Sequence, residues 1–503
     1  MSRRPTLVHH LLDDAAGRWP DHQAVSGGDR QVTYRRLYED SLRLAGWLTE
    51  RGVGRGDRLV VVAPGSPPVA ALLFAASRIG AVFVVLHEQV TGAPLRHVLT
   101  DCEPSLLVSA EPADRETAAQ LGVAVAHPDE VDARCDAADG PPATPTKPEP
   151  LTVDPVCLVY TSGTTSLPKA VVSAHQQVVF VTGAIGSQLR YRDDDVIYCA
   201  LPPSFDYGLY QLFLAAGSGA HLVFGRSAQT GPLLLRSLSA CRATVFPAVP
   251  ALAEALARLV RRGGAGDLRL RLLTNTGAAM ATQTLGVLRA ALPGLRVQLM
   301  FGLTECKRTA IMPPDGDLRR PGASGLPLPG TEVFVVDEEG RRLGPGAVGE
   351  FVIRGPHVML GYWRRPELTA ERFPRRDGLF PELRSGDYGW LDDEGYLYFD
   401  GRRDDIYKER GFRVSATEVE TAAHRVPGVD SATVLPPERS RGAVLVAVTT
   451  RPSDEVLGAM PAYIEPFKIP QRCLTVDVLP LTRNGKVDRK ALTVLAEEGS
   501  DAR

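Results

Sequence analysis

One polar segment of this 503-residue chain combines the residue types that bind phosphates. Residues 156–169 read VCLVYTSGTTSLPK, so an apolar run leads into a loop of hydroxyls and glycine that ends at Lys169. Hydroxyls and backbone N–H groups of such a loop can surround an anion closely, and the lysine adds a positive charge. The segment is not a Walker A loop, because no glycine directly precedes the lysine. The alternative is a polar surface turn.

Three later segments carry the other charges that a phosphate site needs. Thr304-Glu305 offers a carboxylate that could hold Mg²⁺ against phosphate oxygens, although such a pair can also simply begin a helix. Gly386-Asp387 offers a second carboxylate, or only a turn. Lys486 lies in the run PLTRNGKVDRK, which could also be a basic surface turn. Each segment alone is a weak indication of function, and only their combination indicates a phosphate-binding site.

In this order, the segments resemble the motifs of the adenylate-forming superfamily, which contains acyl-CoA synthetases, nonribosomal peptide synthetase adenylation domains and luciferases. The resemblance runs over residues 156–490 and includes GEFVIRG at 349–355, Gly361-Tyr362 and GRRDD at 401–405. Members usually read YTSGTTGxPKG in the phosphate loop, whereas this chain has Ser166 and Ala170 at the two glycine positions. A serine fits there if the position does not require a positive φ.

The resemblance implies ATP and Mg²⁺ as cofactors and a role for each matching residue. Thr304 would contact phosphate, Glu305 would hold the metal, and Lys486 would enter the site during adenylation, so these three are expected to be catalytic. Asp404 would be the hinge of a mobile lid. The expected nucleotide-binding residues are Thr161, Ser162, Gly163, Thr164, Thr165, Lys169, Gly302, Asp387 and Arg402. Gly361-Tyr362 is expected to be mainly structural.

The resemblance also implies the reaction. A carboxylate is a poor electrophile, and attack on the α-phosphorus of ATP converts it to an acyl-adenylate with release of pyrophosphate. Because charge develops on phosphate oxygens, positioned cations and donors would carry the catalysis. The lid would then rotate about the hinge to admit a thiol. The expected enzyme is a standalone AMP-forming ligase.

The pocket for the small organic acid is expected around Ser204-Phe205-Asp206-Tyr207-Gly208. Asp206 aligns with the position where peptide synthetase domains pair a carboxylate with the substrate amine, and a buried carboxylate needs a cationic partner. However, some acyl-CoA ligase-like sequences carry a similar FDYG, and Asp206 could instead cap a helix. Further expected pocket residues are Tyr207, Tyr210, Asn275, Thr276 and Met300.

Two cations directly after the Thr-Glu pair could also belong to this pocket. Lys307 and Arg308 could recognise a second acidic group or a small anion, and a few members of the superfamily activate nitrite. The alternative is a surface pair on a helix.

The sequence leaves two candidates for the thiol acceptor, a carrier protein and free CoA. The tail NGKVDRKAL is closer to the branch that loads carrier proteins, whereas the segment 405–414 has a layout also seen in CoA ligases. A non-catalytic nucleotide-binding homologue is a further alternative, because of Ser166 and Ala170. Against it, the expected catalytic and nucleotide-binding charges are all present.

The elements around these motifs predict an α/β fold. Apolar helical spacing at 37–48 and 68–79 alternates with strand-like runs at 58–63 and 81–86, as in parallel βαβ units. A second α/β run follows from 156 to about 300, then short alternating segments predict a small β-rich subdomain. The tail predicts a mobile α+β lid, which divides the chain into an N-terminal adenylation core, 1–402, and a C-terminal lid domain, 403–503.

Composition argues against several classes of protein. The net charge of −2 gives no basic field for nucleic acid, and no apolar run is long enough to span a membrane. The seven cysteines are scattered singly, which indicates neither a zinc site nor a disulfide framework. Free thiols and the absence of a signal-like start predict a cytoplasmic protein.

Overall fold

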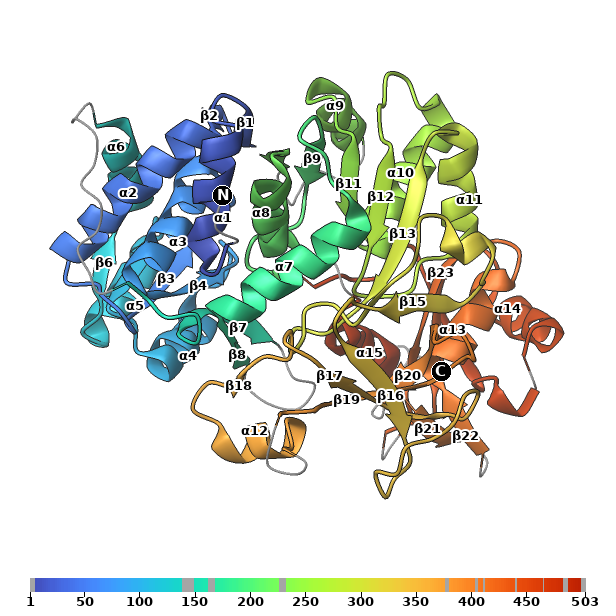
Figure 1. Cartoon of the computed structure of the whole chain (residues 1–503). Coiled ribbons are helices and arrows are strands. Elements are labelled where there is room, and N and C mark those ends of the chain that lie inside the picture. Colours follow the sequence, from blue (N-terminus) through green and yellow to red (C-terminus); the bar gives the residue numbers. More distant parts are fainter. Residues whose placement is uncertain are drawn as a thin grey trace. The chain divides into compact units, whose positions relative to one another are not determined.

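The computed structural model describes residues 5–137, 149–161, 168–225, 232–375, 380–402, 406–409, 412–438, 441–464, 466–482 and 487–498. They form two compact units (Figure 1). The first contains Met1–Arg319, Pro327–Glu332 and Ile353–Leu383, and the second contains Arg320–Leu326, Val333–Val352 and Arg384–Arg503. Each unit is described by itself below.

The first unit contains a sheet built largely from parallel strands. Its order is β18-β8-β7-β4-β3-β5-β6. The strands are β3 (Arg58–Val62), β4 (Val82–Leu86), β5 (Leu106–Ser109), β6 (Ala124–Ala126), β7 (Pro155–Thr161), β8 (Lys169–Ala174) and β18 (Gly361–Tyr362). Only β8 runs antiparallel to its two neighbours. The predicted βαβ units at 37–86 are therefore confirmed.

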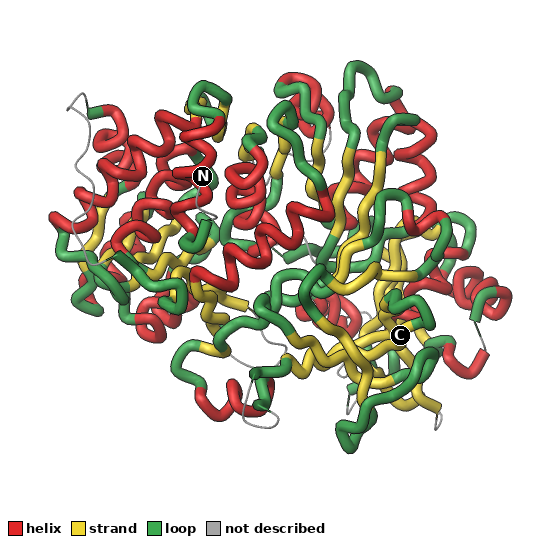
Figure 2. The backbone as a smooth tube through the Cα atoms, viewed as in Figure 1, coloured by secondary structure: helices red, strands yellow, loops and turns green. Residues whose placement is uncertain are grey.

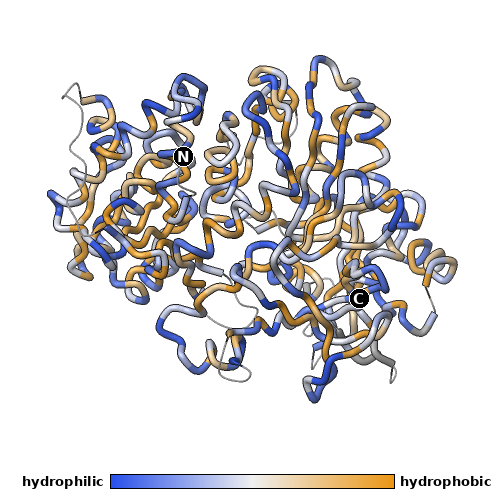
Figure 3. The backbone as a smooth tube through the Cα atoms, viewed as in Figure 1, coloured by the Kyte–Doolittle hydropathy of each residue, from blue (hydrophilic) through white to orange (hydrophobic). Residues whose placement is uncertain are grey.

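Both faces of this sheet are covered by helices, which explains the continuous apolar runs of its strands. Leu59 and Val61 belong to the core shared with α1 (Val8–Arg18), α2 (Tyr34–Glu50) and α3 (Pro67–Ile79). Their neighbours Val60 and Val62 face the other way, toward α4 (Gly92–Cys102) and α5 (Pro112–Gln120). Helix α6 (Pro128–Asp136) packs on α2 and α3. Figure 3 shows these strands mostly in the hydrophobic colours.

The first unit holds a second run of strands in the order β14-β13-β12-β11-β9-β10-β1-β2. The strands are β1 (Gln23–Gly27), β2 (Arg30–Thr33), β9 (Val196–Cys199), β10 (His221–Phe224), β11 (Val245–Ala248), β12 (Leu272–Asn275), β13 (Arg296–Phe301) and β14 (Ala310–Ile311). The five strands from β13 to β10 are parallel to one another. Helices α7 (His175–Leu189) and α8 (Asp206–Ser218) share a core with one face of the strands. Helices α9 (Pro232–Ala240), α10 (Pro250–Gly263) and α11 (Thr282–Ala291) belong to a separate core with the other face. Figure 2 shows this alternation of helices and strands.

The second unit contains the predicted β-rich part and an α+β part. The β-rich part has the order β16-β17-β19-β20-β15. Its strands are β15 (Ala323–Pro327), β16 (Glu332–Val336), β17 (Gly349–Arg354), β19 (Leu383–Leu391) and β20 (Leu397–Arg402). The α+β part consists of a hairpin, β21 (Ile406–Glu409) and β22 (Phe412–Ser415), and the sheet β23 (Val429–Leu435), β24 (Val444–Thr449) and β25 (Arg472–Val476) with α13 (Ala416–Arg425), α14 (Ser453–Ala459) and α15 (Arg489–Glu498).

Alternation along β24 explains why helices cover both sides of the small sheet. Leu445 and Ala447 pack in the core that includes α13, whereas Val444 and Val446 pack with Leu492 of α15. The part of the chain that the structure describes also contains the short helix α12 (Pro366–Arg372) and 3₁₀ turns at Gly316–Leu318, Met460–Ala462 and Pro466–Lys468. The mixed α/β fold class is confirmed.

Some features of the sequence lie outside the residues that the structure describes, and one predicted boundary differs from the boundaries of the compact units. The Pro-rich run GPPATPTKPEP at 140–150 lies mostly outside the described residues. The division at 402/403 differs from the compact units, because the second unit also takes in the β-rich strands. The motion of a lid beginning at 403 stays a prediction. Within the described part of the chain, no helix is long and apolar enough to cross a membrane.

Candidate active site

The two strands that frame the predicted phosphate loop form an antiparallel pair. Strand β7 ends at Thr161 and β8 begins at Lys169, and these two residues lie opposite each other. The Thr161 hydroxyl donates to the Lys169 carbonyl at 3.5 Å. On the approach to β8, the His97 ring nitrogen Nε2 lies 2.8 Å from the Pro168 carbonyl. The buried strands thus hold both ends of the loop, whose residues Ser162, Gly163, Thr164 and Thr165 lie outside the described residues.

The Thr-Glu pair lies in a compact turn between β13 and β14, so the alternative that it only begins a helix is wrong. The turn is closed by a backbone hydrogen bond from Thr309 to Phe301 at 2.8 Å and another from Arg308 to Cys306 at 2.8 Å. Gly302 makes this closure possible. A Cβ there would meet the Lys307 carbonyl oxygen and would approach the Arg308 Cα at 2.8 Å.

Glu305 is held by a tyrosine from a distant part of the chain. The Tyr362 hydroxyl donates to Glu305 Oε1 at 2.7 Å. The face of the same ring lies 4.0 Å from the Lys169 ammonium, a cation–π distance. The first residue of β8 and the predicted metal carboxylate therefore contact one side chain. Thr304, beside Glu305, is half-buried.

The predicted acid pocket begins at the N-terminus of α8. Asp206 is the first residue of that helix, but Phe205 is the N-cap and no side-chain capping bond is made, so the capping alternative is wrong. Asp206 is only 6% exposed. Tyr207 and Tyr210 are fully buried one turn apart, and the Tyr207 hydroxyl lies 2.6 Å from Thr274 Oγ1.

Lys307 and Arg308 face these two tyrosines. The Lys307 ammonium lies 5.7 Å from the Tyr210 ring centre, and the Arg308 guanidinium lies 4.8 Å from that of Tyr207. Lys307 is 1% exposed and Arg308 5%, and both lie in the turn after β13, so the alternative of a surface pair on a helix is wrong. Lys307 also adopts a left-handed backbone conformation, with φ 65°, which orients its side chain at a conformational cost.

The Asp206 charge lies in the same region as the two cations. Burial raises the pKa of the Cys157 thiol on β7, the Lys307 charge opposes that shift, and the Asp206 carboxylate adds to it. Burial, followed by Cys157 and Asp206, also raises the pKa of Tyr210. Opposite charges therefore act on one small apolar region between β7 and α8.

Several buried polar atoms of this region have no hydrogen-bond partner within the described part of the chain. They are Ser204 Oγ, Tyr210 OH, Lys307 Nζ and Arg308 Nε. Buried polar groups in native proteins are nearly always paired, because leaving one unpaired costs about 1–3 kcal/mol. Such a concentration is expected where a bound ligand supplies the missing partners.

The other predicted pocket residues follow the carboxyl ends of parallel strands. Asn275 is the last residue of β12 and donates to the Ala248 carbonyl at the end of β11, at 3.2 Å. Thr276 follows it, and Met300 lies near the end of β13. All three are buried. Ligands of open α/β sheets bind at this edge, where the loops leave the strands.

In the second unit, two of the predicted nucleotide-binding residues form a cross-strand pair. Asp387 on β19 lies opposite Arg402 on β20, and the Arg402 guanidinium donates to Asp387 Oδ1 at 3.0 Å. Asp387 is 1% exposed. The predicted hinge Asp404 and lid lysine Lys486 lie outside the described residues.

Comparison with known proteins decides the family of this site. The family described as AMP-binding enzyme matches residues 12–363, and its C-terminal domain matches residues 418–486. The chain belongs to the AMP-binding enzyme family. It is therefore a member of the adenylate-forming superfamily and an AMP-forming ligase that uses ATP.

Relatives of this AMP-binding enzyme activate acids for different thiols. A fatty acid–[acyl-carrier-protein] ligase, ScoC of Streptomyces coeruleorubidus, is 30% identical to this chain. The alignment covers 94% of this chain and 93% of ScoC. A feruloyl-CoA synthase of Amycolatopsis sp. is 31% identical, and the alignment covers 95% of this chain and 98% of the synthase. Tyrocidine synthase 2 of Brevibacillus parabrevis is 29% identical over 97% of this chain, which spans only 14% of that synthase. The chain also spans 46% of PhsC, a phosphinothricin tripeptide synthetase of Streptomyces viridochromogenes.

Two solved structures are similar to this AMP-binding enzyme. ATP-bound MatB from Rhodopseudomonas palustris has a TM-score of 0.85 and 27% identity, over 97% of this chain and 99% of MatB. VinN in complex with L-aspartate has a TM-score of 0.72 and 38% identity, over 78% of this chain and 98% of VinN.

The residues around Glu305 fit a magnesium ion. One carboxylate oxygen is held by Tyr362, and no described hydrogen bond occupies the other, Oε2. Mg²⁺ prefers oxygen ligands, so the chemistry of this carboxylate suits the ion. Bound there, the ion would neutralise charge on phosphate oxygens.

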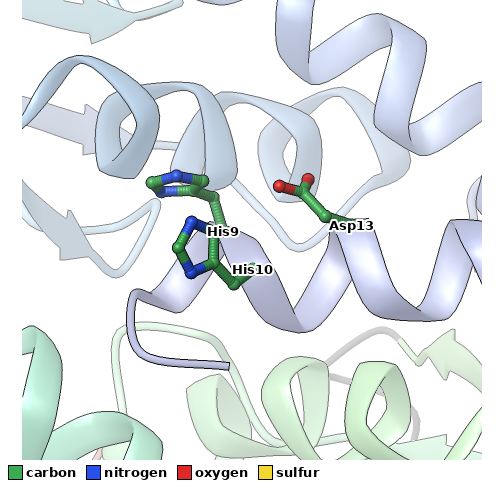
Figure 4. A group of neighbouring side chains, drawn as sticks. All are labelled: His9, His10 and Asp13. Atoms are coloured by element: carbon green, nitrogen blue, oxygen red, sulfur yellow. The ribbon is translucent and has the colours of Figure 1, made fainter. Parts of the chain in front are cut away.

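Another group of possible metal ligands lies on α1, where His9, His10 and Asp13 come together (Figure 4). Their ligand atoms already have partners. His9 Nδ1 lies 3.0 Å from Ser77 Oγ, and His10 Nδ1 accepts from the Leu7 N–H at 3.3 Å. Arg78 forms an ion pair with Asp13. An ion there would have to displace that guanidinium, so the contacts indicate a structural role.

Tyr362 is the site residue that sequence reasoning missed. The Gly-Tyr motif was expected to be mainly structural, yet the hydroxyl contacts Glu305, 57 positions away in sequence. No local pattern connects these two residues. The only sequence signal was their common presence among the family-like motifs.

Proposed function

We propose that this enzyme activates an amino acid bearing a second carboxylate and transfers its acyl group to the phosphopantetheine thiol of a carrier protein. The observation that carries the proposal is the set of buried charges around α8. Lys307 and Arg308 offer two cations, Asp206 offers one carboxylate, and none of these has an ion-pair partner within the described residues.

Charge balance favours an acidic amino acid over a simple acid. One carboxylate of the substrate reacts with ATP. The other carboxylate would pair with Lys307 and Arg308, and the ammonium group would pair with Asp206. A fatty or aryl acid would leave all three buried charges without partners, which is costly in a low-dielectric site. The VinN complexes with L-aspartate and with 3-methylaspartate support this substrate class.

The described residues suggest how the substrate would be oriented. The two tyrosine rings lie beneath the cations and exclude water from them, which strengthens their attraction for a carboxylate. The reacting carboxylate would attack the α-phosphorus, forming a new C–O–P bond as the bond to pyrophosphate breaks. The carrier thiolate would then attack the acyl carbon and release AMP. Lys486 and Lys169 would stabilise charge on the phosphates.

A carrier protein is the favoured acceptor for two reasons. The tail NGKVDRKAL is closer to the carrier-loading branch, and ScoC and the peptide synthetases are among the relatives. The feruloyl-CoA synthase makes free CoA the alternative acceptor.

The first test is pyrophosphate release with ATP and Mg²⁺ across a panel of acids. L-Aspartate, L-glutamate and 3-methylaspartate are compared with L-asparagine, succinate, ferulate, a fatty acid and nitrite. We expect release with an acidic amino acid and a loss of at least about tenfold with asparagine or succinate, since a bond to a buried charge is worth about 1.5–3 kcal/mol. Lys486→Ala should abolish release with every acid.

Variants assign each charge to a substrate group. Lys307→Met and Arg308→Gln should reduce kcat/KM for the acidic amino acid while leaving the weak rate with its amide nearly unchanged. Asp206→Asn should remove the preference for aspartate over succinate. Arg242→Gln, which changes an exposed arginine, is the matched control. Equal rates with ferulate and aspartate in the wild type would contradict the proposal.

The acceptor is tested separately. The acyl-adenylate made from the preferred acid is offered either free CoA or a phosphopantetheinylated carrier protein, and thioester formation is followed by mass spectrometry. Thioester on the carrier protein alone is expected. Acyl-CoA as the main product would identify a CoA ligase instead.

A further inference from the structure

One tyrosine contacts both a loop lysine and a predicted metal carboxylate. The Tyr362 hydroxyl is 2.7 Å from Glu305 Oε1, and the ring face is 4.0 Å from the Lys169 ammonium. Tyr362 is 5% exposed, so water competes little with either contact. A single rigid side chain thus fixes two groups that would act on one nucleotide.

Neighbouring contacts hold the tyrosine in place. Strand β18 pairs with β8, so that Tyr362 lies opposite Val171. The Tyr362 N–H donates to the Thr369 hydroxyl at 2.9 Å, and the ring packs edge-to-face on Phe373 with centroids 5.5 Å apart. Arg372 also faces the hydroxyl. A phenol is protonated at neutral pH, so the Tyr362 hydroxyl is the donor and the Glu305 carboxylate is the acceptor.

A second hydrogen bond connects the segment before Tyr362 to the turn that carries Glu305. The Met359 N–H donates to the Glu305 carbonyl at 2.9 Å. The backbone around Glu305 is therefore fixed independently of the Tyr362 hydroxyl. Removing the hydroxyl alone should free the carboxylate without displacing the turn, which makes its contribution measurable.

We propose that Tyr362 is a positioning residue that sets Glu305 for Mg²⁺ through its hydroxyl and Lys169 for phosphate through its ring. The inference rests on the proposed binding of magnesium and ATP at this site. Two separable effects follow, because a phenylalanine keeps the ring and loses the hydroxyl, whereas a leucine loses both.

The experiment measures nucleotide binding to the full chain by titration calorimetry, with α,β-methylene-ATP as the probe. The dissociation constant is measured in EDTA and in excess Mg²⁺, and the ratio gives the enhancement by the metal. Tyr362→Phe should reduce this enhancement about tenfold and leave the EDTA constant within about twofold of wild type. Tyr362→Leu should in addition weaken binding in EDTA about threefold.

The coupling to Glu305 gives the decisive comparison. In a Glu305→Gln background, adding Tyr362→Phe should change the enhancement no further, because the hydroxyl acts through that carboxylate. Tyr38→Phe, which removes a hydroxyl from α2, should behave like wild type in both media. Thermal unfolding of each variant checks that the fold is retained.

Two results would overturn the proposal. One is an unchanged metal enhancement in Tyr362→Phe. The other is the same reduction with and without Glu305, which would mean that the hydroxyl does not act through the carboxylate. Binding of the analogue requires no acid, so failure of the proposed acidic amino acid would appear only in the pyrophosphate panel and is distinguishable from failure here.

Discussion

At the scale of single residues, Gly302 is required because the chain folds back over it. The turn that carries Thr304 and Glu305 returns to β13 so closely that a Cβ on Gly302 would meet the Lys307 carbonyl oxygen. That neighbour is backbone and cannot simply rotate away. The same closure of the turn buries Lys307 and Arg308. The position of both cations therefore depends on the absence of a side chain at Gly302.

Gly302→Ala is expected to reduce pyrophosphate release more than about tenfold and to lower stability by about 1–3 kcal/mol, because overpacking moves neighbouring backbone. Activity and thermal unfolding are the measurements. Gly286→Ala on α11 is the matched control, since a Cβ there meets nothing within 4 Å. Similar activity in the two variants would contradict the close approach.

At the scale of elements, α8 carries three pocket residues on one helix. Asp206, Tyr207 and Tyr210 depend on where the first turn of α8 packs. The helix is pressed against the preceding loop at Gly208, where a Cβ would meet the Pro202 carbonyl and lie 2.7 Å from that of Leu201. A displaced helix would move the carboxylate and both aromatic rings together.

Gly208→Ala should therefore raise KM for the acid, with a smaller change in KM for ATP, because α8 contributes to the acid pocket. Gly217→Ala lies in the same helix, where the nearest atom is 4.0 Å away. It should be neutral or stabilise by about 0.5–1 kcal/mol through helix propensity. Kinetics for both substrates and thermal unfolding distinguish the two glycines, and equal behaviour would show that the contact at Gly208 is unimportant.

At the scale of the whole molecule, buried imidazoles couple stability to pH. Burial lowers the pKa of His175, His221 and His357 to about 4 each. Burial, then Arg78, His10 and His175, lowers that of His9 to about 2. Unfolded histidines titrate near pH 6.5. Between these values the unfolded chain binds more protons, so stability falls as the pH is lowered.

The midpoint of thermal unfolding should therefore be lower at pH 5 than at pH 7.5. His357 offers the cleanest test, because neither ring nitrogen has a partner within the described residues. It contributes a loss of about 2 kcal/mol at pH 5 relative to pH 7.5. His357→Leu should flatten the pH dependence by about that amount. Parallel pH profiles for the variant and the wild type would show that His357 does not titrate as expected.

The sequence alone determined the features that depend on neighbouring residues. The strand at 58–63 and the helix at 68–79 follow from the local apolar pattern, and the structure confirms them. The order of the polar motifs indicated the adenylate-forming family, which the comparisons confirm. Local patterns suffice there, because each depends on contacts between residues a few positions apart. The roles of Asp404 and Lys486 stay predictions.

Tertiary structure decided which charges are buried and what they contact. The helix start at Thr304, the capping role of Asp206 and the surface pair Lys307-Arg308 were all plausible locally, and all three were wrong. The contact of Tyr362 with Glu305 joins positions 57 apart. Burial and pairing depend on segments that meet only when the sheets assemble. The fold, rather than any single motif, therefore determines the electrostatic environment of the proposed substrate.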